Sequence, residues 1–215
     1  MEISKSTIST NNKLLTVLVY FKIEPQYQME QLKLIKGFVE KAVKKQNGFI
    51  SANFHTSLDG TRIANYAQWR SEKDYNGGFS NPDVDAASKD VFKYAQGEAR
   101  YYDLVYSNKD AEIRENSNIA TVINYFSTTP QNQQKMIDAW IDFVENYVKK
   151  LPGFISANLH RSRDGTRVFN YAQWERKEDV ESMLNNPKAK KSIDAINKIA
   201  EPDWHLYSVP YVARQ

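Results

Sequence analysis

The 215-residue sequence contains no cysteine, which excludes disulfides, thiolate nucleophiles, iron–sulfur clusters and cysteine-based zinc sites. It has no run of about 18–20 apolar residues that could span a membrane. The polar segment from Met1 to Asn12 lacks the apolar stretch of a secretory signal. We therefore expect a soluble, cytoplasmic protein with no membrane partner.

An excess of charge of one sign is also missing. Lys and Arg number 29 against 26 Asp and Glu, a net charge of +3 that is spread along the chain. No basic stripe of the kind that binds nucleic acid is present, so we expect no nucleic-acid partner. The histidines, His55, His160 and His205, have no ligand-type neighbours at short spacing, so no metal site is predicted. Neither a GxGxxG nor a Walker-type loop occurs, which removes the usual nucleotide fingerprints.

The sequence does contain an internal repeat. The segment Gly48 to Asn53 recurs as Gly153 to Asn158, 105 residues further on. Of the 22 positions from Gly48 to Trp69, 17 are identical in the second copy. Because the copies align without a gap, the chain is a duplicated domain. The charged segment from Asn108 to Ser117 has no apolar periodicity and is the predicted linker.

Each copy has the same order of predicted elements. In the first copy, a β-branched and aromatic run at 15–21 predicts a strand, and apolar residues three or four apart predict a helix over 29–43. Two strands, a charged helical stretch and a final strand complete the order β-α-β-β-α-β. We predict an α+β protein of two ferredoxin-like repeats, residues 13–108 and 118–215. Because helices cover one face of each sheet, the bare faces are expected to pack sheet to sheet as an internal pseudo-dimer.

The turn between the two central strands decides which side chains share a face. The motif Ser57-Leu58-Asp59-Gly60 favours a type I turn followed by a glycine bulge, which would pair Ser57 with Thr61. A two-residue type I′ turn would instead place His55 on the opposite face from Asn65 and Trp69. We favour the bulged turn, since the serine occurs in both copies while the next residue differs. The shared face then contains Phe49, Ser51, Asn53, His55, Ile63, Asn65 and Trp69.

Such a face combines hydrogen-bonding groups with aromatic rings, as small-molecule pockets do. Each of these residues taken singly is more often structural. The segment Asn65 to Trp69, preceded by Gly48-Phe49 and His55, resembles the antibiotic biosynthesis monooxygenase domain, and Asn170 to Trp174 repeats it. This resemblance implies a dimeric α/β barrel and, in the best-understood members, oxygenation of aromatic polyketides without metal, flavin or haem.

The expected function is therefore cofactor-independent oxidation of an electron-rich aromatic, such as an anthrone, a quinol or a polyketide-like ring, by molecular oxygen. The alternative is a non-catalytic small-molecule-binding or structural protein of the same fold. Haem degradation is a minor third option, because Phe79 and Leu184 occupy the places of the helical histidine that haem-degrading relatives require. The small aromatic substrate and oxygen are the expected partners, and the pseudo-dimer is expected to be a monomer or to form a further homodimer.

The resemblance also implies that His55, Asn65, Trp69 and Tyr75 occupy the places of site residues in anthrone-oxidising relatives. Our hypothesis is that Asn65 and the Trp69 indole donate hydrogen bonds to a developing oxyanion and that His55 or Tyr75 handles the proton. The second copy has Val180 where the first has Tyr75, so the first half is the expected active half. The predicted substrate-binding residues are Phe49, Ser51, Asn53, Asn170, Trp174 and His160.

Overall fold

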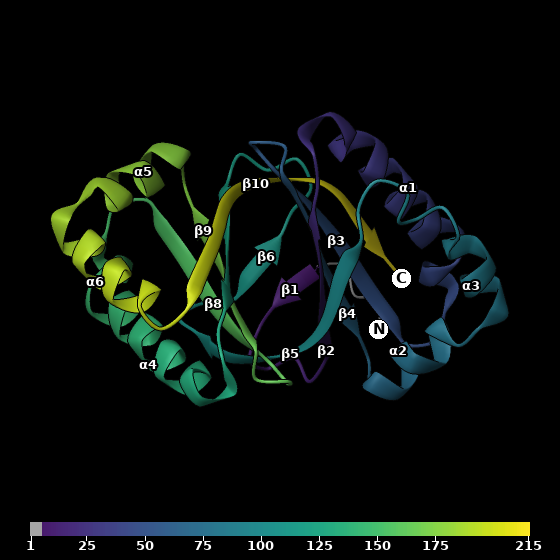
Figure 1. Ribbon diagram of the computed structural model, residues 1–215, viewed down its shortest axis with the longest axis horizontal. Helices are drawn as coiled ribbons and strands as arrows, with labels where there is room; N and C mark the ends of the chain where they lie inside the picture. Colours follow the sequence, from purple (N-terminus) through teal and green to yellow (C-terminus); the bar gives the residue numbers. More distant parts are fainter. Residues whose placement is uncertain (1–5) are drawn as a thin grey trace.

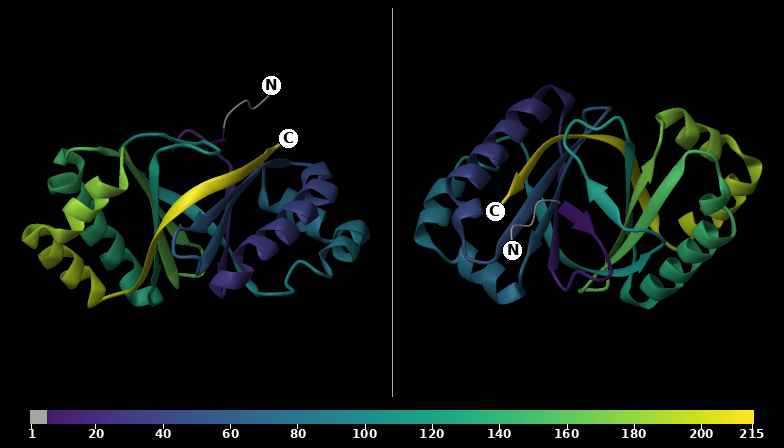
Figure 2. Two further views of the ribbon diagram at one scale, coloured as in Figure 1. Left: turned by 90° about the horizontal axis from the view of Figure 1, so that it is seen from above. Right: turned by 180° about the vertical axis from the view of Figure 1, so that it is seen from behind.

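The computed structural model describes residues 6–215 and consists of two similar halves on either side of a closed β-barrel (Figure 1). The barrel strands run in the order β10-β3-β4-β2-β5-β8-β9-β7. Helices lie outside the barrel on two opposite flanks, as the view from above shows (Figure 2). The predicted α+β fold of two ferredoxin-like repeats, packed as a pseudo-dimer, is confirmed.

The bounds of the elements repeat from one half to the other. The first half contains β2 (Leu15–Lys22), α1 (Gln28–Lys41), β3 (Phe49–Ser57), β4 (Arg62–Trp69), α2 (Glu72–Phe79), α3 (Pro82–Ser88) and β5 (Gly97–Ser107). The second contains β7 (Ala120–Ser127), α4 (Pro130–Asn146), β8 (Phe154–Ser162), β9 (Arg167–Trp174), α5 (Lys177–Asn185), α6 (Pro187–Asn197) and β10 (Glu201–Arg214). Short 3₁₀ turns cover Pro25–Tyr27, Val43–Lys45 and Val148–Lys150. No helix within residues 6–215 is long and apolar enough to cross a membrane.

The last strand of each half closes the barrel by pairing with the other half. Strand β5 pairs antiparallel with β8, and β10 arches over the barrel to pair with both β7 and β3 (Figure 1). Because every strand of the barrel has two neighbours, the barrel itself leaves no unpaired edge. The fold therefore depends on both halves together.

The apolar stripe predicted for the first long helix is mostly confirmed. Leu32, Ile35 and Val39 are buried in α1, but Met29 is exposed. Gln28 is buried in its place, since its side-chain amide donates to the backbone oxygens of Ser57 and Arg62 at 3.0 Å. Two polar side chains of the helix, Gln28 and Gln31, thus anchor it to neighbouring segments rather than facing water.

The predicted linker is not wholly irregular. It contains β6 (Ala111–Ile113), which pairs antiparallel with β1 (Ser6–Ile8) at the centre of the barrel view in Figure 1. Ile8 and Ile113 are fully buried among the aromatic side chains of the barrel interior. The sequence did not predict this strand, because the segment is charged and has no apolar periodicity. Only Ala111 and Ile113 of the strand face the barrel.

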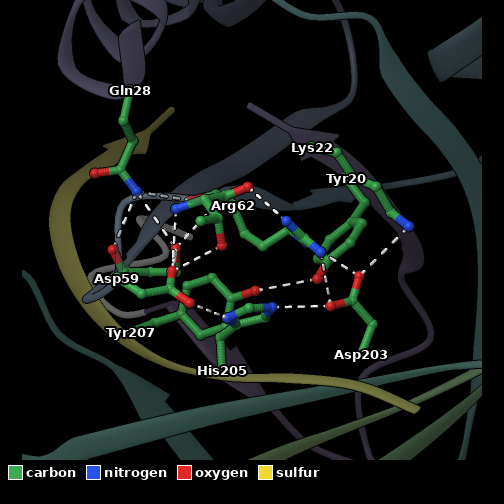
Figure 3. Close-up of polar contacts among 10 residues, drawn as sticks. Tyr20, Lys22, Gln28, Asp59, Arg62, Asp203, His205 and Tyr207 are labelled. Atoms are coloured by element: carbon green, nitrogen blue, oxygen red, sulfur yellow. Dashed lines mark hydrogen bonds and ion pairs between the residues drawn. The ribbon is translucent and has the colours of Figure 1, made fainter. Parts of the chain in front are cut away.

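A polar cluster joins the halves at one seam (Figure 3). Arg62 of the first half forms two 3.0 Å hydrogen bonds to the carboxylate of Asp203 on β10. His205 lies between two carboxylates, with Nδ1 2.8 Å from Asp59 and Nε2 2.8 Å from Asp203. We name His205, Asp59 and Asp203 the histidine clip. At the equivalent seam, Arg100 takes the place of His205 and contacts Asp164.

Candidate active site

The hairpin between β3 and β4 has a register that differs from the predicted one. His55 pairs with Ala64, and Phe54 pairs with Asn65. The predicted turn itself forms, since the Gly60 N–H donates to the Ser57 oxygen at 3.0 Å. However, the Asp59 carboxylate accepts hydrogen bonds from both the backbone N–H and the hydroxyl of Thr61. These bonds keep Thr61 in the loop, so that the register shifts by one residue.

A shift of one residue moves alternate side chains to the other face of the sheet. The prediction that His55, Ser51 and Asn53 share a face with Asn65 and Trp69 is therefore wrong. All three lie inside the barrel, fully or almost fully buried. The Asn53 side-chain amide donates to the Tyr66 backbone oxygen at 2.8 Å, and the Ser51 hydroxyl donates to Gln68 at 3.2 Å. Each of these three side chains has at least one partner within the protein, although the Asn53 amide oxygen has none among residues 6–215, and none of the three faces the helices.

The buried histidines bind tyrosines of the opposite half. His55 Nε2 lies 3.0 Å from the Tyr171 hydroxyl, and His160 Nε2 lies 3.1 Å from the Tyr66 hydroxyl. Burial lowers the pKa of His55 to about 4 and that of His160 to about 3, so both are neutral at physiological pH. Among residues 6–215, no group of three or more His, Asp and Glu side chains is placed to hold a metal ion. The histidines thus join the halves inside the barrel.

The other predicted residues of the first half do meet beneath the helices. A register shift between Phe49 and Ser51 turns Phe49 toward Trp69, and their rings meet edge to face at 5.5 Å. The Tyr75 ring, from α2, lies 5.4 Å from the Trp69 ring. These three residues and Asn65 line a cavity of about 110 Å³ between the sheet and the helices, which we name the first cavity. An apolar cavity of about 150 Å³ can accommodate benzene, so this volume suits about one aromatic ring, with the remainder of a larger ligand at the opening.

The lining of the first cavity is almost entirely apolar. Among residues 6–215, no Asp, Glu, Lys, Arg or His side chain lines it. Burial raises the pKa of Tyr75 to about 12, so its phenol stays protonated. The amide oxygen of Asn65 is buried and has no hydrogen-bond partner among residues 6–215. Phe79 and Phe92, which are 40% and 41% exposed, also contribute to the lining. The Asn65 carboxamide is thus available to a ligand.

The second half has an equivalent cavity of about 110 Å³, which we name the second cavity. Asn170 and Trp174 line it, and the Trp174 ring meets Phe154 edge to face at 5.2 Å. His160, predicted with them, lies in the barrel instead. Val180 lies in the lining where the first cavity has Tyr75.

Sequence reasoning missed two polar residues of the second cavity. Asn124 on β7 lies directly opposite Asn170 on β9, and the amide oxygens of both are buried without a partner among residues 6–215. The indole nitrogen of Trp140, on α4, is likewise buried and unpartnered. The first half has Val19 and Ile35 at these two positions. A comparison of the differences between the copies, rather than their identities, would have found both residues.

Known proteins resemble the chain in both sequence and fold. A model of the antibiotic biosynthesis monooxygenase family matches residues 14–90 and 119–195. Tetracenomycin-F1 monooxygenase of Streptomyces glaucescens is 33% identical over 92 residues, which cover 43% of this chain and 82% of that protein.

Two solved structures share the fold over nearly the whole chain. The crystal structure of an anthrone oxidase-like protein superimposes with a TM-score of 0.85 at 22% identity, covering 97% of this chain and 96% of the other. A putative monooxygenase from Fusobacterium nucleatum superimposes with a TM-score of 0.65 at 12% identity, covering 94% of both chains. The family model matches most of each half, and the chain therefore belongs to the antibiotic biosynthesis monooxygenase family.

Proposed function

We propose that the chain is a cofactor-independent monooxygenase that oxidises a small, electron-rich aromatic with molecular oxygen. One observation carries the proposal: in each half, an apolar cavity sized for an aromatic ring is lined by a tryptophan and by an asparagine whose amide oxygen has no partner in the described part of the chain. The names of a relative and a similar structure, tetracenomycin-F1 monooxygenase and anthrone oxidase-like protein, support the same class of substrate.

The chemistry needs an anion rather than a bound cofactor. Molecular oxygen is a triplet and reacts slowly with closed-shell molecules, but a phenolate or carbanion can transfer one electron to it. The resulting superoxide and substrate radical combine to a peroxide anion, which takes up a proton from water. The hydroperoxide formed in this way then loses water to leave a carbonyl. In the first cavity, the Asn65 amide and the Trp69 indole N–H would donate to the substrate oxyanion. Each donor of this kind contributes about 3 kcal/mol in enzymes from which it has been removed.

The reaction also needs an acceptor for the proton that the substrate loses. His55 lies in the barrel and is excluded as the base, and none of the described residues that line the first cavity is another ordinary base. Tyr75, with a pKa of about 12, can donate a hydrogen bond but does not accept the proton near neutral pH. We therefore propose that the substrate releases its proton to water at the cavity opening. This restricts the substrate to aromatics with an acidic hydroxyl or methylene, such as anthrones and dihydroxynaphthalenes.

Oxygen uptake tests the proposal. The chelator-treated protein is incubated with an anthrone or a dihydroxynaphthalene, and oxygen consumption is followed with an electrode. We expect turnover above background, a loss of about 100-fold or more in kcat when Asn65→Leu and Asn170→Leu are combined, and little change for the exposed-surface control Leu58→Ser. Failure of a panel of such aromatics to raise oxygen uptake, with a folded protein, would overturn the proposal in favour of a binding protein.

A further inference from the structure

The two cavities differ at several positions. Tyr75 of the first cavity is replaced by Val180 in the second, which removes a hydroxyl, but three other differences each add a polar group. Where the first cavity has Val19 and Ile35, the second has Asn124 and Trp140. A third aligned pair, Phe92 and Asn197, also changes from apolar to polar. Each substitution adds a hydrogen-bonding group to the second cavity, while the rings of Phe154 and Trp174 stay as in the first half.

Two of the three added groups have a buried atom that no described residue satisfies, and so does Asn170, which the first half shares as Asn65. The amide oxygens of Asn124 and Asn170 and the indole nitrogen of Trp140 have no partner among residues 6–215. Asn170 is only 3% exposed and Trp140 only 7%. A buried polar group without a partner destabilises a fold, and most such groups in proteins are satisfied. Several of them lining one cavity indicate that a ligand satisfies them.

The geometry limits what that ligand can be. Asn124 and Asn170 face each other across neighbouring strands, where opposite side chains lie about 4.5–5.5 Å apart. A carboxamide both donates and accepts, so this pair can engage two oxygen substituents at one edge of a planar ring. Trp140 extends from α4, on the helical side of the same cavity, and can only donate.

We propose that the two cavities are non-equivalent ligand sites. The second cavity selects aromatics with two oxygen substituents on neighbouring ring positions, and Asn124 and Trp140 are its specificity-determining residues. The first cavity, with Asn65 as its one carboxamide, takes less oxygenated rings without that selectivity. The choice of aromatic ligands rests on the proposed function, but the selectivity concerns binding and requires no turnover.

Anaerobic calorimetry tests the proposal, because without oxygen the ligands cannot be oxidised. The full-length protein is titrated with 2,3-dihydroxynaphthalene, which has two neighbouring hydroxyls, and with 2-naphthol, which has one. We expect two sites for 2,3-dihydroxynaphthalene, one at least 10-fold tighter than the other, and a smaller difference for 2-naphthol. Two equal sites for 2,3-dihydroxynaphthalene, or no binding of either compound, would overturn the proposal.

The duplication supplies the matched variants. Asn124→Val and Trp140→Ile give the second cavity the residues of the first, and we expect the tighter site to weaken at least 10-fold. The reciprocal Val19→Asn is expected to tighten binding of 2,3-dihydroxynaphthalene at the first cavity. If Trp140→Ile does not fold, Asn124→Val alone decides the question.

A merely structural role for Asn124 predicts a different result. In that case Asn124→Val would lower the melting temperature and leave the preference for 2,3-dihydroxynaphthalene unchanged, which contradicts the proposal. The proposed function is tested separately: selective binding without oxygen uptake would refute the monooxygenase reaction alone, and oxygen uptake with two equal sites would refute the selectivity alone.

Discussion

Replacing His205 with arginine is expected to remove the pH dependence that the histidine clip gives to stability above pH 6.5. Each ring nitrogen of His205 lies 2.8 Å from a carboxylate oxygen, one on Asp59 and one on Asp203. Only the imidazolium can donate at both positions, since the neutral ring would turn a lone pair toward one carboxylate. At the equivalent seam Arg100 contacts Asp164 and Glu98, and its charge does not titrate near neutral pH.

The direction in which stability changes with pH follows from the shifted pKa values. Burial disfavours the charged ring, but the hydrogen bonds to Asp203 and Asp59 outweigh it and raise the pKa of His205. Burial also opposes ionisation of Asp59 and Asp203, yet the hydrogen bonds that they accept lower both pKa values overall. The contribution of His205 is therefore fully present below its unfolded pKa of about 6.5 and is lost as pH rises through the raised folded value.

The contribution of the histidine clip to stability is limited by the solvent exposure of its carboxylates. A hydrogen bond to a charged group contributes about 1.5–3 kcal/mol, whereas exposed ion pairs contribute up to about 1 kcal/mol. The Asp59 side chain is 51% exposed and that of Asp203 is 19% exposed, so the clip lies between these limits. We expect a loss of about 1–2 kcal/mol on deprotonation. For a chain of this size, this corresponds to roughly 2–8 °C in melting temperature.

The assay is urea unfolding between pH 6 and 9 for the wild type, His205→Arg and His205→Gln. The wild type should lose about 1–2 kcal/mol across this range, His205→Arg should lose little, and His205→Gln should be less stable than the wild type at pH 6 and equal to it at pH 9. Arg100→Gln is the matched control, with a loss that does not depend on pH in this range. If the free energy of unfolding changes equally with pH in the wild type and in His205→Arg, the reasoning is refuted.

Three further substitutions test the site and the fold by urea unfolding. Asn124→Val removes a buried amide oxygen that has no partner within residues 6–215, and is expected to leave the free energy of unfolding unchanged or to raise it by about 1 kcal/mol; a clear loss would refute this. His55→Phe removes one hydrogen-bond partner of the Tyr171 hydroxyl, which keeps Thr121 as the other, and should cost about 0.5–1.5 kcal/mol. The same substitution should weaken the fall in stability below pH 6.5, since the unfolded state then takes up one proton fewer. Gly153→Ala puts a side chain at a φ of 73° and against Asp179, which should cost more than about 1 kcal/mol; a neutral effect would contradict the geometry.

The architecture could be predicted from the sequence because the duplication provides two sequences for every element, and their patterns can be compared. The strand from Leu15 and the helix that follows it have counterparts 105 residues further on, so an accidental pattern in one copy would have lacked support in the other. A sheet with helices on one face also needs a cover for its other face. The repeat and the uncovered sheet face together were sufficient to predict the pseudo-dimer.

The faces of the central strands could not be predicted in the same way. The Asp59 carboxylate adds Thr61 to the loop, and this single interaction moves His55 from the helical side into the barrel. Both copies contain the same Asp and Thr, so the repeat gave no warning. Phe49 lies beside Trp69 as predicted, but for a different reason, because an irregularity after Phe49 offsets the shifted register.

The two halves can differ in their cavities because each cavity is built from one half, whereas the barrel interior is built from both. Of the described residues, those that line the first cavity all lie within 17–99 and those that line the second all lie within 122–204. The barrel interior, in contrast, contains pairs such as His55 with Tyr171 that join both halves. A substitution in the barrel therefore affects the contacts of both repeats, whereas a substitution in one cavity leaves the other intact. In a symmetric dimer of identical chains, a change such as Val19 to Asn would appear in both cavities at once. Fusion of the two copies in one chain removes that constraint, so the second cavity can contain Asn124 and Trp140 while the first keeps its apolar wall.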